Sequence, residues 1–65
     1  MTRSDLIDMD VQVIRRTNMA VLVTLDVPDN AVWIPLSQVE LHPTGIGGIE
    51  TLTLPEWLAT EKGLV

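Results

Sequence analysis

The sequence predicts an α+β fold, in which a small, curved antiparallel sheet of four to five strands is followed by one C-terminal helix. Two observations predict the sheet: several stretches alternate apolar and polar residues, and turn-forming residues separate them. A third predicts the helix, because the apolar residues near the C-terminus recur every three to four positions. The 65 residues form one domain, 1–65, whose stability depends on an aliphatic core because Cys is absent.

The first predicted strand begins at Met9, and its two faces differ in polarity, as in a strand buried on one side. One face holds Met9, Val11 and Val13, and the other holds Asp8, Asp10 and Gln12. Ile14 breaks the alternation, so a β-bulge or a two-sided strand end is expected there. The preceding segment, Met1–Asp8, is expected to form either a short helical turn capped by Ser4 or a loose arm.

The middle of the chain is predicted to contain two strands and two tight turns. Met19–Val27 is largely apolar on both faces, which indicates a central strand or one covered on both sides. The elements around it are expected to be a turn at Arg15–Asn18, a turn at Pro28–Asn30, a short strand at Ala31–Ile34 that Pro35 ends, a tight turn at Leu36–Gln38 capped by Ser37, and an extended stretch at Val39–Leu41.

The last part of the chain is predicted to be a loop, a strand and a helix. The loop is His42–Gly48, and the strand Ile49–Leu54 has Leu52 and Leu54 inward. The helix, about Pro55 to Lys62, is expected to place Trp57 and Leu58 against the sheet. We also expect Trp33 to pack in the core. A sheet of this size resembles the SH3-like barrels.

The sequence contains no pattern that predicts catalysis, a cofactor or a metal. His42 lies in a predicted loop, where its ring is expected to be solvated, and no Cys is present. Neither Ser4 nor Ser37 lies in a G-x-S-x-G context. The glycines at 45–48 lack the Lys-Ser/Thr of a phosphate-binding loop, so they are expected to form a connector. We therefore expect a protein that binds rather than an enzyme.

The charge balance indicates what kind of partner the protein binds. Nine acidic residues against four basic ones give a net charge of −5, which argues against direct nucleic-acid binding and fits either solubility or a partner with a basic surface. The Arg15–Arg16 pair is expected to be a solvated turn or an anchor for an acidic partner. No stretch is long and apolar enough for a membrane span, and the N-terminus is unlike a signal peptide. We expect a cytoplasmic monomer.

Three segments of the second half, Val32–Val39, Thr53–Ala59 and Glu61–Leu64, resemble small proteins encoded by phages and prophages. In size, acidity and lack of catalytic groups the chain is similar to the anti-CRISPR proteins, and in particular to inhibitors of type I systems. The resemblance implies location in a bacterial host cell and binding to the Cascade surveillance complex, which prevents recognition of target DNA. No functional residue follows from it by motif.

Two hypotheses follow. In the first, the chain is an inhibitor that occupies a basic, DNA-binding surface and mimics DNA through surface carboxylates. The candidate partner-binding residues are Asp8, Asp10, Asp26, Asp29, Glu40 and Glu50. In the second, the chain is a non-enzymatic adaptor of phage replication or recombination that binds another protein through an apolar groove near Trp33. Exposure of Trp33 would favour the second hypothesis.

Overall fold

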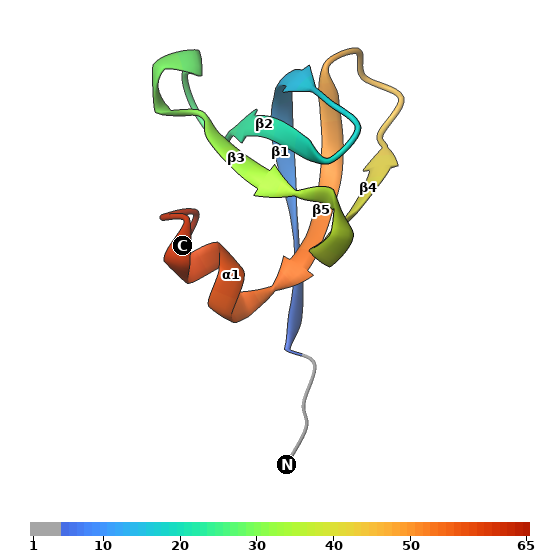
Figure 1. Cartoon of the computed structure of the whole chain (residues 1–65). Helices are drawn as coiled ribbons and strands as arrows, with labels where there is room; N and C mark the ends of the chain where they lie inside the picture. Colours follow the sequence, from blue (N-terminus) through green and yellow to red (C-terminus); the bar gives the residue numbers. More distant parts are fainter. Residues whose placement is uncertain (1–4) are drawn as a thin grey trace.

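Five antiparallel strands form one sheet with the order β3-β2-β1-β5-β4 in the computed structural model, which describes residues 5–65 (Figure 1). The predicted fold class is confirmed. The strands are β1 (Leu6–Arg16), β2 (Ala20–Thr24), β3 (Val32–Pro35), β4 (Glu40–Pro43) and β5 (Ile49–Pro55). Two single turns of 3-10 helix, η1 (Pro28–Asn30) and η2 (Leu36–Gln38), flank β3, and the helix α1 (Glu56–Glu61) follows β5.

The sheet curves because its long central strand changes partner midway. The first half of β1 pairs with β5, from Leu6 opposite Pro55 to Gln12 opposite Ile49. The second half pairs with β2, and the register shifts there between Val13 and Arg15. The shift falls at Ile14, where a β-bulge or a two-sided strand end is predicted, and an irregularity of this kind increases the local twist of a strand. Figure 1 shows the result, with β3 and β4 at the two edges of a strongly twisted sheet.

Several predicted boundaries are wrong. Arg15 and Arg16, predicted to lie in a turn, are the last residues of β1, and the strand predicted at Ala31–Ile34 is Val32–Pro35. Leu6–Asp8 is extended and belongs to β1, so the predicted helical turn is absent there, whereas its proposed cap, Ser4, lies outside the described residues. The strand predicted at Met19–Val27 is shorter because threonines end it on both sides: Thr17 Oγ1 accepts the amide of Ala20 at 3.0 Å, and Thr24 Oγ1 donates to the carbonyl of Val27 at 2.9 Å. Pro55 is the N-cap of α1 and not its first helical residue.

The core lies between the concave face of the sheet and α1. All its fully buried apolar side chains are Val, Ile, Leu or Ala, and each large one contributes about 1.5–3 kcal/mol to folding. They are Val11, Val21, Val23, Ile34, Leu52, Leu54, Leu58 and Ala59. Leu58 and Ala59 come from α1, which follows directly from β5 (Figure 1). The helix thus covers the sheet as predicted.

Both tryptophans, however, lie outside this core, contrary to the prediction. Trp33 is 43% exposed, because Val32 and Ile34 on either side of it face inward and a strand alternates its side chains. Trp57 is 58% exposed, because α1 is a short helix of six residues and Leu58 and Ala59 occupy the side that faces the sheet. Ser37 also differs from expectation, since no side chain caps η2.

Candidate functional site

Three of the six predicted carboxylates lie together on the convex face of the sheet. Asp8 in β1 and Glu40 in β4 both pair with Thr53 of β5, so the three side chains form one row across the sheet. Asp10 and His42 pair in the same way with Thr51, which forms a second row. Residues directly opposite one another in antiparallel strands have side chains on the same face. We call the surface formed by Asp8, Asp10 and Glu40 the acidic face.

The two threonines of β5 hold the aspartates in place. Thr53 Oγ1 donates a hydrogen bond of 2.7 Å to Asp8 Oδ1, and Thr51 Oγ1 donates one of the same length to Asp10 Oδ1. No hydrogen bond within residues 5–65 engages the Oδ2 atoms of these aspartates. Each carboxylate is therefore oriented by one oxygen and can accept a donor from a partner with the other.

Glu40 completes the acidic face. Its side chain is 72% exposed, and its Oε1 atom lies 3.2 Å from Nε2 of His42. His42 itself belongs to β4 and not to the predicted loop, although its side chain is 57% exposed and solvated as expected. The imidazole is therefore a neighbour of the acidic face, and within residues 5–65 its ring hydrogen-bonds only to the carboxylate of Glu40.

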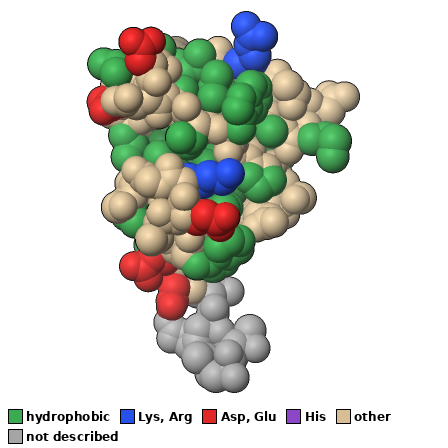
Figure 2. All heavy atoms as spheres, turned by 60° about the vertical axis from the view of Figure 1, so that its left-hand side comes forward, with side chains coloured by type: hydrophobic (Ala, Val, Ile, Leu, Met, Phe, Trp, Pro, Cys, Tyr) green, Lys and Arg blue, Asp and Glu red, His purple; other side chains and the backbone are tan. Residues whose placement is uncertain are grey.

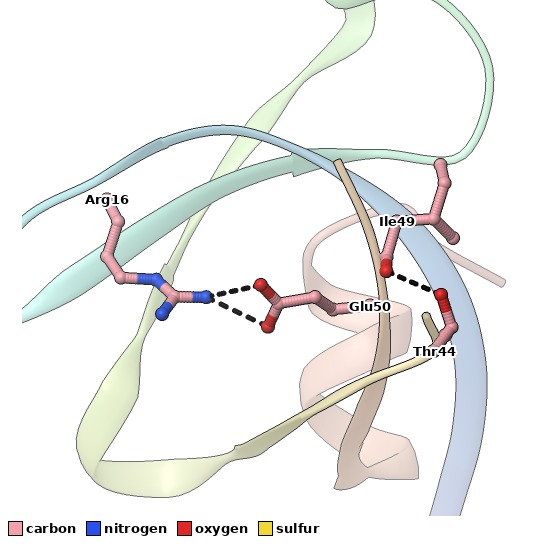
Figure 3. A network of polar contacts seen from close by, with 4 residues as sticks. All are labelled: Arg16, Thr44, Ile49 and Glu50. Atoms are coloured by element: carbon pink, nitrogen blue, oxygen red, sulfur yellow. Dashed lines mark hydrogen bonds and ion pairs between the residues drawn. The ribbon is translucent and has the colours of Figure 1, made fainter. Parts of the chain in front are cut away.

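The other three predicted carboxylates lie elsewhere. Glu50 pairs with the buried Val11 and thus faces the concave side, where Arg16 Nη2 donates hydrogen bonds of 2.9 Å to both its oxygens (Figure 3). This ion pair joins the end of β1 to the start of β5. Beside it, Thr44 Oγ1 donates to the carbonyl of Ile49 at 2.8 Å and fixes the preceding loop (Figure 3).

Asp26 and Asp29 belong to the turn between β2 and β3. Asp26 accepts hydrogen bonds from the amide of Val27, the side-chain amide of Asn30 and the hydroxyl of Thr24, and these lower the pKa of its carboxyl below the ordinary value of 3.8. Asp29 lies within η1. The role of Asp26 in this turn is structural, and the six predicted residues do not form one site.

A second kind of surface consists of exposed apolar side chains. Trp33 pairs with the half-buried Leu22, which in turn pairs with Arg15, so an aromatic, an aliphatic and a cationic side chain form a row on the convex face. Met19, the residue before β2, is 80% exposed. Hydrophobic side chains reach the surface over much of the face shown in Figure 2. The condition that favours the adaptor hypothesis, exposure of Trp33, is therefore met.

Two hollows flank η2 and share Ser37. The first, which we call the mixed hollow, has a volume of about 230 Å³ and is lined by Leu6, Ser37, Gln38, Val39, Glu40 and Thr53. The second, the apolar hollow, has a volume of about 420 Å³ and is lined by Asn18, Met19, Pro35, Leu36 and Ser37. Because Glu40 and Thr53 line the mixed hollow, it opens beside the acidic face.

No three His, Asp or Glu side chains within residues 5–65 are arranged to hold a metal ion. No helix in the same range is long and apolar enough to cross a membrane. Comparison of the chain with protein-family models, with curated proteins and with solved structures finds no match.

Proposed function

We propose that the protein is a non-enzymatic inhibitor whose acidic face occupies a basic, nucleic-acid-binding surface of another protein. The observation that carries the proposal is the gathering of Asp8, Asp10 and Glu40 on one face of the sheet. With the net charge of −5, these groups favour encounter with a basic surface and set the orientation of docking. The partner suggested by the resemblance to anti-CRISPR proteins is Cascade.

The spacing of the carboxylates suits the role of a phosphate mimic. Asp8 and Asp10 are two residues apart on one strand, which places their Cα atoms about 7 Å apart. Glu40 is two strands away from Asp8, at about 10 Å. These separations are of the same order as those between phosphate charges on a nucleic-acid duplex. The threonine hydrogen bonds also limit the motion of Asp8 and Asp10, which lowers the entropy cost of binding.

The test is a charge-neutral replacement of the acidic face. In the variant Asp8→Asn/Asp10→Asn the side chains keep an oxygen that accepts from Thr53 and Thr51, so the fold should be retained. The matched control is Asp29→Asn/Glu61→Gln, which removes the same charge from η1 and α1. Both variants would be assayed for co-purification with Cascade complexes and for relief of inhibited DNA binding.

We expect the acidic-face variant to lose association and the control to retain it. The association of the unmodified protein should also weaken as salt is added, because exposed charges are screened. Equal effects of the two variants would refute a localised carboxylate surface. Unchanged inhibition by the acidic-face variant would refute the proposal itself.

The exposure of Trp33 supports a second candidate function, that of an adaptor for phage replication or recombination. In this role the row formed by Trp33, Leu22 and Arg15 would contact another protein, since aromatic and Arg side chains dominate many interfaces. A pull-down from infected cells with the unmodified protein and with Trp33→Ala separates the two functions. Loss of the captured proteins with Trp33→Ala, but not with Asp8→Asn/Asp10→Asn, would favour the adaptor.

A further inference from the structure

The mixed hollow and the apolar hollow share Ser37 of η2, and we call the two together the η2 groove, with Glu40 at one end and Met19 at the other. We propose that this groove binds an extended segment of the partner that carries an Arg or Lys and, two residues away, an aliphatic side chain. The inference rests on the proposed function for the nature of the partner, a protein with a basic surface. It adds the site at which one basic side chain of that partner is bound.

The mixed hollow has the chemistry that a long cationic side chain requires. The side chain of Glu40 is 72% exposed, so its carboxylate can pair with the cationic group of the partner. The hydroxyls of Ser37 and Thr53 supply further oxygen acceptors. Leu6 and Val39 line the same hollow and can cover the aliphatic stem. Arg and Lys side chains commonly bury their stems on apolar surface while the charged head stays at its edge.

The charge around the mixed hollow favours a cation more strongly than Glu40 would alone. Asp8 does not line the hollow, but it lies in the same row as Glu40, on the other side of Thr53, so a second carboxylate about 10 Å from Glu40 adds to the negative potential there. The basic group nearest in the sheet is the imidazole of His42, which is in contact with Glu40. A guanidinium or ammonium group entering the hollow would therefore compete with this exposed and weak contact.

The apolar hollow shares Ser37 with the mixed hollow. Met19, which is 80% exposed, lines it together with Pro35 and Leu36, and none of its lining residues is charged. Met is flexible and polarizable, so it can adapt to aliphatic side chains of different shape. An apolar residue of the partner would remove Met19 and itself from water at the same time.

The length of η2 sets the spacing between the two bound side chains. The three residues Leu36–Gln38 span about 6 Å as a 3-10 turn. Residues i and i+2 of an extended peptide point to the same side and lie about 7 Å apart. An extended segment with Arg or Lys at one position and an aliphatic residue two positions away can thus place both side chains across η2.

The experiment is an NMR titration of the isotope-labelled protein with capped tripeptides, Arg-Gly-Leu and Leu-Gly-Arg, which cover both chain directions. The control peptides carry citrulline, the neutral isostere of arginine. We expect one arginine peptide to shift the amide signals of Met19, Ser37, Gln38 and Thr53, and its citrulline form to bind about tenfold more weakly. Glu40→Gln should cause the same loss, whereas Glu61→Gln on α1 should not.

Each result is decisive for the inference. Shifts at η2 that depend on both the arginine charge and Glu40 support it. Absence of shifts at η2, or shifts that Glu40→Gln and citrulline leave unchanged, overturn it. If the tripeptides fail at η2 while Asp8→Asn/Asp10→Asn still abolishes association with the partner, the proposed function stands and only the groove is wrong. If both fail, the acidic face itself has no role.

Discussion

Breaking the ion pair between Arg16 and Glu50 should destabilise the protein by a small and salt-dependent amount. The pair joins the end of β1 to the start of β5 at an N–O distance of 2.9 Å (Figure 3). Its two partners are separated by 34 residues in sequence, so the contact forms only when the sheet has closed. The pair therefore reports on the curvature that brings the two halves of the fold together.

The expected magnitude follows from the exposure of the two side chains. Two unit charges about 4 Å apart attract by ~1 kcal/mol in bulk water and ~4 kcal/mol at an effective dielectric constant of ~20. Arg16 is 48% exposed and Glu50 is 26% exposed, so water reaches both and most of the larger figure is lost to screening. Immobilising the long Arg16 side chain reduces the gain further. We expect a coupling free energy of about 1 kcal/mol, near the upper end of measured exposed pairs.

The assay is a double-mutant cycle followed by urea unfolding. The four proteins are the unmodified chain, Arg16→Gln, Glu50→Gln and the double variant, each measured at low salt and at about 1 M salt, where the screening length is ~3 Å. The cycle removes the effects of each single replacement and isolates the interaction between the two charges. A coupling energy near zero at low salt, or one unchanged by salt, would refute the reasoning.

Four further outcomes are expected. Leu52→Ala should cost about 2–5 kcal/mol in urea unfolding, because Leu52 is fully buried, and this approaches the ~3–10 kcal/mol total expected for a domain of this size. The pKa of Asp26 is lower in the folded than in the unfolded chain, so the ionised carboxylate stabilises the fold above pH 3.8, and this stabilisation is lost as the pH falls below 3.8. The difference in unfolding free energy between the unmodified protein and Asp26→Asn should therefore shrink as the pH is lowered below 3.8. Gly48→Ala should cost about 1 kcal/mol, because Gly48 has a φ of 82°. Acrylamide should quench the fluorescence of Trp33 and of Trp57, which are 43% and 58% exposed, and a protected tryptophan would contradict the packing described above.

The sheet was predictable because its strands follow the rule of alternation. Met9, Val11 and Val13 face inward and Asp8 and Asp10 outward, as their period-two pattern predicts. The irregularity at Ile14 was predictable for the same reason, since it is the point at which the pattern fails. The boundaries of β2 were not, because hydrogen bonds of the threonine hydroxyls, and not hydrophobicity, end this strand.

The tryptophans show where residue type misleads. Large aromatic side chains are often buried, and this preference predicted core positions for Trp33 and Trp57. Their neighbours decided otherwise: Ile34 and Leu58 take the inward positions, and the strand and helix periods then turn the adjacent residue outward. A stricter use of periodicity at Trp33, between Val32 and Ile34, would have placed it on the convex face.

The acidic face required the pairing of strands, which no local pattern contains. Alternation predicts that Asp8 and Asp10 share one face of β1. Only the pairing of β1 with β5 places Thr53 and Thr51 where they donate hydrogen bonds to these aspartates, and only the pairing of β5 with β4 brings Glu40 onto the same face. The same register turns Glu50, one residue from Thr51, to the opposite face and into contact with Arg16. A shift of the register by one residue would exchange these two sets of side chains. The grouping of these carboxylates is therefore a property of strand pairing. Under the proposed function, variants that alter the β1–β5 register should change binding even where every carboxylate is kept.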